Sequence, residues 1–241
     1  MKAPHDGMTT QPFSHSEIDM KLYFHPASTT SRPIMLFAAE NRIALDEQVV
    51  DIFTGEHYQQ PFEVVNPNHL VPVLEDGNFR LTESSAILKY LADKSDSALY
   101  PKDLQQRARV NERMDWINTQ LCRDFAYGYV YPQAFPSHKR RSSEAHGATL
   151  AWGKERAQGW LKVLDQHILG TNNSYLCGSS ITIADYYGAS FVALGELIGS
   201  DYSDYPNVKR WLGRMKQLAS WKRVNEVIDG YAATLKGTQP V

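Results

Sequence analysis

The sequence predicts a small α/β domain followed by an all-helical domain. Strand-like and helix-like apolar patterns alternate between residues 21 and 97, whereas after residue 104 no strand pattern follows and apolar residues recur at helical spacing. A chain of 241 residues is long enough for both parts to bury a core. We expect a flexible polar extension at 1–19, the α/β domain at 20–97, a linker at 98–104, the helical domain at 105–235 and a tail at 236–241.

The α/β domain is expected to begin with a strand, a helix and a second strand. Lys21–His25 reads as the first strand and Gln48–Ile52 as the second. Ser31–Asn41 reads as the helix between them, with Ser31 as its cap and Pro33 in its first turn. Because β-helix-β connections are nearly always right-handed, we expect the two strands to be parallel neighbours. The apolar face of this helix comprises Ile34, Phe37 and Ala38.

A hairpin and a helix are expected to complete this domain. A loop and a short helix lead to the apolar segment Val71–Leu74, and the dipeptide Asp76-Gly77 predicts a hairpin turn before a returning strand at Phe79–Leu81. Thr82–Ser85 provides capping residues for the next helix. The resulting order, β-α-β and then β-β-α, is the thioredoxin-like arrangement. The apolar face of the last helix comprises Ile87, Leu88 and Leu91.

The remainder of the chain reads as helices. Two apolar series at helical spacing predict two of them; the first comprises Val110, Met114, Ile117 and Leu121, and the second Ala157, Leu161, Leu164 and Ile168. Further helices are expected over Tyr186–Leu197, Trp211–Leu218 and Trp221–Ile228. Thr182 and Asp185 have the spacing of a capping box, so we assign them to folding and not to chemistry.

Composition disfavours several classes of function. A net charge of −2 with 22% charged residues gives no basic surface for nucleic acid. No apolar run reaches the roughly 20 residues of a membrane span, and the N-terminal segment lacks the apolar region of a signal peptide. Cys122 and Cys177 form no Cys-x-x-Cys pair, which favours a reducing cytoplasm, and the eight histidines show no metal-ligand spacing.

Two segments carry a resemblance to a known family. "LVPVLEDGNFRLTESSAILKYL" (Leu70–Leu91) and "ITIADYY" (Ile181–Tyr187) are similar to characteristic segments of the cytosolic glutathione transferases. With the spacing between them, the resemblance extends over residues 20–235. It implies an N-terminal thioredoxin-like domain that binds glutathione and an all-helical C-terminal domain that binds the second substrate.

Two other segments resemble particular branches of that family. "LYFHPASTTSRP" and "TGEHYQQPFEVVNP" are most similar to the serine-using theta- and delta-type branches and their bacterial relatives. The resemblance makes Ser28 the catalytic residue, whose hydroxyl donates a hydrogen bond to the glutathione sulfur. A cysteine there could form a mixed disulfide, whereas a serine keeps glutathione non-covalent. A plain turn serine is the alternative. Tyr23 is interpreted as a packing residue, and whether Thr29 or Tyr23 assists Ser28 stays open.

The resemblance also assigns residues to the glutathione site. Pro72 is expected in cis form, which turns the backbone of Val71 towards the peptide ligand. Leu70 precedes this pair, where some theta-type relatives have a lysine. His69 is the candidate substitute, and His57 matches a histidine that approaches the glycyl carboxylate.

The γ-glutamyl end of glutathione is assigned to Glu83 and Ser84. A serine hydroxyl and helix N-terminal amides suit a carboxylate, and a glutamate suits an ammonium group. Helix capping alone would also explain this pair of residue types.

The acceptor pocket is expected on the first helix of the second domain, in the aromatic-rich segment from Trp116 to Phe135. The aromatic candidates are Trp116, Tyr127 and Tyr131, because aromatic side chains with polar tips can line an apolar pocket. Arg123 is a candidate by resemblance, since theta-type and dehalogenase relatives have an arginine near this position. An aromatic stripe of this kind is also typical of a helical core. Arg32, in the first turn of a helix, is interpreted as a structural residue that holds neighbouring loops.

The resemblance therefore implies a homodimeric glutathione transferase in which bound thiolate attacks a small, electrophilic, largely apolar substrate to form a thioether. A glutathione-dependent dehalogenase or ether-cleaving enzyme of the same family is the first alternative. A non-catalytic binding or regulatory protein is the second. A disulfide reductase is disfavoured because positions 28 and 31 hold serine. No metal, nucleic acid or membrane partner is expected.

Overall fold

The computed structural model describes residues 20–236, so the predictions for 1–19 and for the tail beyond residue 236 lie outside the described residues. The first part contains a four-stranded mixed sheet of order β2-β1-β3-β4, in which β1 is parallel to β2 and antiparallel to β3. The predicted parallel pairing is thereby confirmed. Its elements are β1 (Met20–Phe24), α1 (Arg32–Glu40), β2 (Asp46–Val49), η1 (Glu56–Tyr58), α2 (Phe62–Val65), β3 (Val73–Asp76), β4 (Phe79–Leu81) and α3 (Ser84–Lys94).

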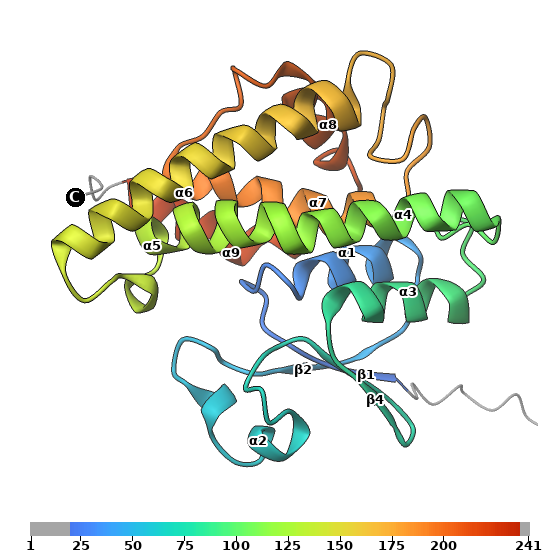
Figure 1. Cartoon of the computed structure of the whole chain (residues 1–241). Helices are drawn as coiled ribbons and strands as arrows, with labels where there is room; N and C mark the ends of the chain where they lie inside the picture. The colour runs from blue at the N-terminus through green and yellow to red at the C-terminus, as the bar shows by residue number, and fades with distance from the viewer. Residues whose placement is uncertain (1–19, 237–241) are drawn as a thin grey trace, which may run out of the picture.

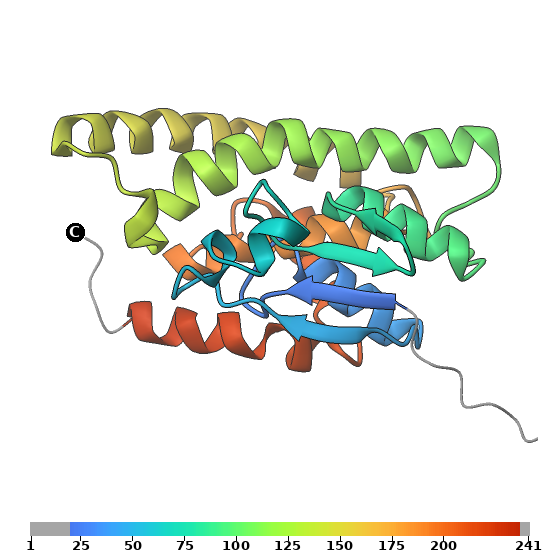
Figure 2. The ribbon, with the colours of Figure 1, turned by 90° about the horizontal axis from the view of Figure 1, so that it is seen from below.

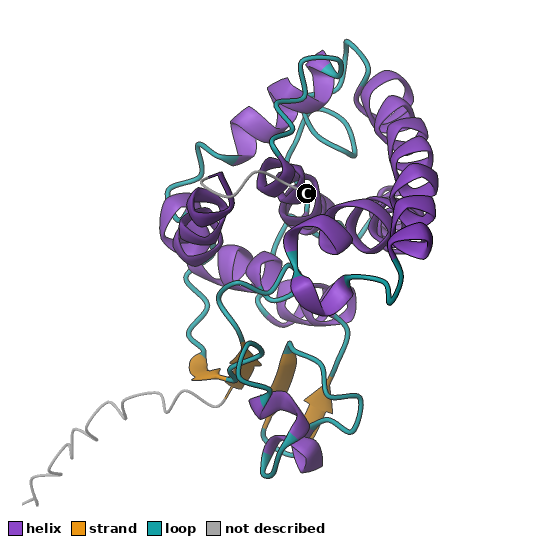
Figure 3. Cartoon of the chain, turned by 90° about the vertical axis from the view of Figure 1, so that its left-hand side faces the viewer, coloured by secondary structure: helices purple, strands orange, loops and turns teal. Residues whose placement is uncertain are grey.

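Helices α1 and α3 lie between the sheet and the helical domain, while α2 lies on the opposite side of the sheet (Figures 1 and 3). The predicted apolar faces of both helices are buried, and all their residues except Ala38 belong to one core that continues into the helical domain. A smaller cluster of Val50, Phe62, Val71 and Val73 forms on the α2 side. Figure 2, which views the molecule from below, shows β1 and β2 running alongside each other in front of the helices.

Two predictions made from the sequence for this domain are wrong. The second strand is Asp46–Val49 and not Gln48–Ile52, because the ladder with β1 pairs Lys21 with Asp46. Ser31 was expected to cap α1, but its side chain makes no capping bond, and its own backbone angles are already helical.

The helical part begins with one long rod formed by α4 (Leu104–Trp116) and the π-helical segment η2 (Ile117–Val130). Figure 1 shows this rod, in green, crossing the front of the molecule with α6 above it. Both predicted apolar series are buried. The further elements are α5 (Tyr131–Ala134), η3 (Pro136–His138), α6 (Ser143–Val163), η4 (Leu164–Leu169), α7 (Ile183–Ala193), η5 (Leu194–Ile198), α8 (Pro206–Met215) and α9 (Trp221–Lys236).

The capping box at the start of α7 is confirmed. The Thr182 N–H and hydroxyl both donate to Asp185 Oδ2, at 2.8 and 3.0 Å. The other oxygen of Asp185 accepts from the Leu176 N–H and from Trp211 Nε1. This fully buried carboxylate therefore ties three segments of the helical domain together. Between residues 20 and 236, no helix has the length and apolar character needed to cross a membrane.

Candidate functional site

Ser28 lies in the tight turn that joins β1 to α1. Its N–H donates to the His25 carbonyl at 2.9 Å, and its own carbonyl accepts from the Arg32 N–H at 3.1 Å. The Ser31 N–H donates to Ser28 Oγ at 3.2 Å. Ser28, and not Ser31, therefore supplies the side-chain oxygen to the N-terminus of α1. An anion beside this hydroxyl would also lie near the positive end of the helix dipole.

A second residue of this turn connects Ser28 to the segment before β3. The hydroxyl oxygens of Ser28 and Thr30 are 3.0 Å apart, and the Thr30 hydroxyl donates to the Val71 carbonyl at 3.0 Å. The Val71–Pro72 peptide bond is cis, as the resemblance implied. The structure thus brings Ser28 together with the backbone of Val71.

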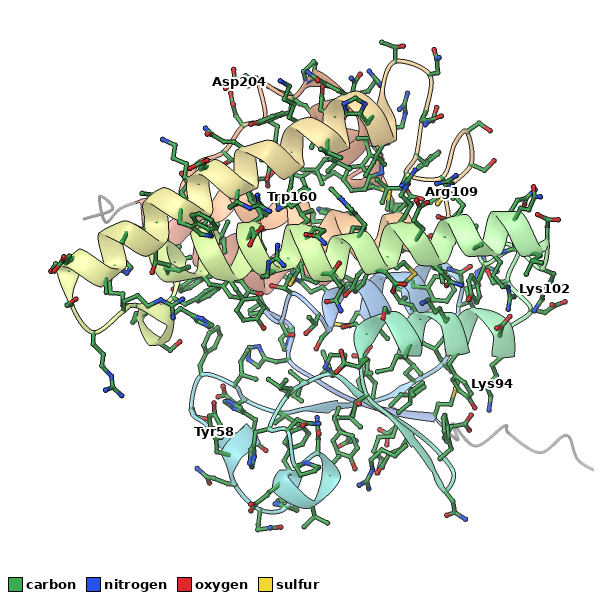
Figure 4. All side chains as sticks on the ribbon, viewed as in Figure 1. Tyr58, Lys94, Lys102, Arg109, Trp160 and Asp204 are labelled. Carbon is green, nitrogen blue, oxygen red and sulfur yellow. The ribbon has the colours of Figure 1, made fainter. Side chains whose placement is uncertain are left out.

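The other residues assigned to this side of the glutathione site lie nearby in the chain. Leu70 is 59% exposed, and its carbonyl accepts from Asn66 Nδ2 at 2.7 Å. His69 Nδ1 donates to the His57 carbonyl at 3.0 Å. The His57 ring packs on Tyr58, and its buried Nδ1 has no hydrogen-bond partner in the part of the chain that the structure describes. Figure 4 shows Tyr58 beside α2, at the end of the molecule away from the helical domain.

Glu83 and Ser84 lie at the N-terminus of α3. Glu83 is exposed and has φ 65° and ψ 111°, a backbone conformation that non-glycine residues rarely adopt. Ser84 is buried in the first turn of α3. Burial, with further contributions that include the negative charge of Glu83, raises the pKa of Tyr127 on η2.

Tyr131 connects the helical domain to the Ser28 turn. It is nearly fully buried, its hydroxyl donates to Thr29 Oγ1 at 2.9 Å, and burial raises its pKa. Tyr127 packs edge-on against it, with ring centroids 4.8 Å apart. Of the predicted acceptor residues, Tyr131 contacts the Ser28 turn directly, and Tyr127 is linked to the turn through Tyr131.

Trp116 and Arg123 have other partners. Trp116 packs against Trp160, which Figure 4 shows between α6 and the long rod. Arg123 is exposed and pairs with Asp124, and this contact together with a hydrogen bond from Trp160 lowers the Asp124 pKa to about 2. Within residues 20–236, no hydrogen bond or ring contact joins either residue to the Ser28 turn or to Tyr131.

Aromatic residues beyond the four acceptor candidates extend the wall beside Tyr131. Phe135 lies 5.3 Å from Tyr131 between ring centroids and stacks nearly parallel on Tyr231 of α9. Tyr231 in turn contacts Phe53, and Phe53 packs on His25 at the end of β1. This aromatic wall, made of Tyr131, Phe135, Tyr231 and Phe53, passes from the helical domain to the α/β domain. Local spacing could not reveal its full extent, because Phe53 and Tyr231 lie far in the sequence from the pair Tyr131 and Phe135.

The side chains of Arg32 and Tyr23 both form their hydrogen bonds with residues outside the Ser28 turn. Arg32 is fully buried; its guanidinium donates to Asn225 Oδ1 of α9 at 2.5 Å and to the Ser190 carbonyl of α7 at 3.5 Å. Burial lowers its pKa to about 10. The Tyr23 hydroxyl donates to Glu75 at 3.1 Å, on the far side of β1 from Leu22 in the main core.

Comparisons with known proteins agree with this arrangement. The glutathione S-transferase N-terminal domain model matches residues 18–93, and the glutathione S-transferase C-terminal domain model matches residues 134–219. A delta-class glutathione transferase of Nilaparvata lugens is 30% identical; the alignment covers 90% of this chain and 99% of that one, with a TM-score of 0.77.

Two further structures are similar over nearly the whole chain. Human glutathione transferase theta-2, solved in complex with glutathione, is 26% identical, with 92% of each chain covered and a TM-score of 0.80. An unclassified glutathione S-transferase of Bombyx mori is 29% identical, with coverages of 91% and 98% and a TM-score of 0.76. The chain therefore belongs to the glutathione transferase family and is a transferase enzyme.

Proposed function

We propose that this enzyme binds glutathione at the Ser28 turn and that the Ser28 hydroxyl donates a hydrogen bond to the glutathione sulfur. The observation that carries the proposal is the direct link from Ser28 through Thr30 to the Val71 carbonyl. It joins the candidate activating hydroxyl to a backbone segment that can pair with a peptide. Because Tyr23 is bound to Glu75 instead, this arrangement also supports the serine-type branch of the family.

The remainder of the glutathione site is assigned by position. The exposed segment at Leu70 and cis Pro72 lies along the peptide backbone of glutathione, and Ser84 with the α3 N-terminus receives the γ-glutamyl carboxylate. Glu83 pairs with the γ-glutamyl ammonium group. His57, whose buried Nδ1 has no partner among the described residues, is assigned to the glycyl end.

The expected gain from thiolate activation is modest. A thiol with a pKa near 8.5 is about 3% ionised at pH 7, and a hydrogen bond to the anion lowers that pKa by about one to two units. Two units give roughly 75% thiolate, but nucleophilicity falls six- to tenfold with the pKa. The net gain is about two- to fourfold. Most of the acceleration must therefore come from holding the acceptor beside the sulfur.

We assign the acceptor to the aromatic wall defined above, joined by Tyr127. Its rings suit a small, largely apolar electrophile, and attack by the thiolate forms a thioether. Trp116 and Arg123 remain candidates beyond this wall, and Arg123 lines the same cavity as Tyr127. Product analysis separates conjugation from the alternatives, since a dehalogenase would release halide without accumulating a stable thioether.

Two further properties are proposed on indirect support. Membership in the family supports a homodimer, which light scattering tests: a mass of about 27 kDa at every concentration would contradict it. The two cysteines are both free, one buried and one half-buried, which supports a reducing, cytoplasmic location.

The ultraviolet absorbance of the bound thiolate as a function of pH tests the role of Ser28. We expect a depressed thiol pKa in the wild type, a higher one in Ser28→Ala, and the wild-type value in Tyr23→Phe. Saturable binding with the same pKa in Ser28→Ala would remove Ser28 from the mechanism. Failure to bind glutathione at all would refute the site.

A further inference from the structure

The hydrogen bonds around Ser28 have a fixed direction. A carbonyl oxygen can only accept, so the Thr30 hydroxyl must use its single proton on the Val71 carbonyl, at 3.0 Å. Thr30 Oγ1 can then only accept from Ser28, whose oxygen lies 3.0 Å away. The two protons therefore point from Ser28 to Thr30 and from Thr30 to Val71.

This direction leaves Ser28 unable to activate a thiol. Its one proton is engaged by Thr30, and its oxygen already accepts from the Ser31 N–H at 3.2 Å. The titratable side chains near the turn do not change this. His25 Nδ1 accepts from the Ala27 N–H, the Arg32 guanidinium donates to Asn225 and Ser190, and the Tyr131 hydroxyl donates to Thr29. Ser28 must turn its hydroxyl away from Thr30 before it can donate to sulfur.

We propose that Thr30 is a positioning residue: when glutathione binds the Val71 carbonyl, Thr30 reverses the direction of the hydrogen bonds that run from Ser28 to Val71. This inference rests on the glutathione site proposed above. In the bound state a backbone N–H of glutathione donates to the Val71 carbonyl. Thr30 then turns its proton to Ser28 Oγ, and Ser28 turns its proton to the sulfur. The thiol proton passes to water, which leaves the thiolate.

The reversal keeps the hydroxyl protons paired in both states. Before binding, one proton lies between Ser28 and Thr30 and one between Thr30 and Val71. After binding, one lies between Thr30 and Ser28 and one between Ser28 and the sulfur. A hydroxyl that accepts a hydrogen bond is also a stronger donor, because bonds in a chain polarise one another. Binding of the peptide backbone is thereby coupled to activation of the thiol.

The thiol pKa of bound glutathione distinguishes this role from simple support of the turn. Thr30→Val keeps the shape of the side chain but removes the hydroxyl. We expect it to raise the thiol pKa by up to about one unit, the effect of one hydrogen bond. Thr30→Ser should restore the wild-type value. In a Ser28→Ala background, Thr30→Val should cause no further shift, because Thr30 acts through Ser28.

Each outcome bears on one proposal. An unchanged or lowered pKa in Thr30→Val would overturn the reversal, as would an equal shift in the presence and absence of Ser28. If Ser28→Ala raises the pKa and Thr30→Val does not, only this inference fails. If Ser28→Ala has no effect, the proposed role of Ser28 fails first. Thr30→Ala repeats the test if the valine variant does not fold, as judged by circular dichroism.

Discussion

Helix α6 crosses η2 where Gly153 lies against Gly128, and this close contact allows a quantitative prediction. A Cβ atom added to Gly153 would lie 2.2 Å from the Gly128 carbonyl oxygen and 3.1 Å from the Tyr129 nitrogen. An ordinary C···O contact needs about 3.3 Å, so Gly153→Ala must separate the two helices by about 1 Å.

The magnitude follows from two opposing effects. Overpacking costs about 1–3 kcal/mol, and the upper part of that range applies because backbone atoms cannot rotate away. Alanine favours a helix interior over glycine by about 1 kcal/mol. We therefore expect Gly153→Ala to lower the free energy of unfolding by about 2 kcal/mol.

Urea unfolding at fixed protein concentration measures this change, and the same helix offers matched controls. Nothing lies within 4 Å of a Cβ added at Gly147 or Gly159. Both positions are exposed, so alanine there should stabilise the protein by about 0.5–1 kcal/mol. A Gly153→Ala variant as stable as these controls would refute the argument from close packing.

The remaining predictions concern two buried polar side chains. Asp185→Asn should lower the free energy of unfolding by about 2–3 kcal/mol, since an amide cannot accept all the bonds now donated by Trp211 and its other partners; chemical denaturation that shows no loss would contradict this. Burial lowers the pKa of His25, whose Nδ1 accepts from the Ala27 N–H. The neutral ring is thus favoured in the folded state, and its contribution is lost as pH falls below the unfolded value of about 6.5. Stability should fall as the pH is lowered below about 6.5 in the wild type and fall less in His25→Asn; equal slopes would contradict this.

Local patterns were enough to predict most of the fold. The hairpin at Gly77, the helical series of the second domain and the capping box at Thr182 each depend on residues close together in the sequence. The second strand was misplaced because Val50 is buried and apolar but lies just after β2, where it packs against the α2 side of the sheet. Burial and strand pairing are separate properties, and an apolar pattern reports only the first.

The candidate site could be predicted only in part. The motifs located Ser28, but the function proposed for Thr30 depends on a contact with Val71, 41 residues away. Arg123 lies on the expected helix, where its guanidinium pairs with the neighbouring Asp124. Which face of a helix borders a site is decided by tertiary packing, which no spacing in one sequence reports.

The bond from Arg32 to Asn225 joins the first helix of the chain to the last. Asn225 lies 193 residues beyond Arg32, yet it accepts from a buried cation only four residues after Ser28. Shortening the C-terminus into α9 would leave that cation without this acceptor and would disturb the adjoining Ser28 turn. Activity lost on truncation would then not report on acceptor binding alone. For the same reason, a chimera that exchanges the helical domain with a relative must carry a compatible partner for Arg32.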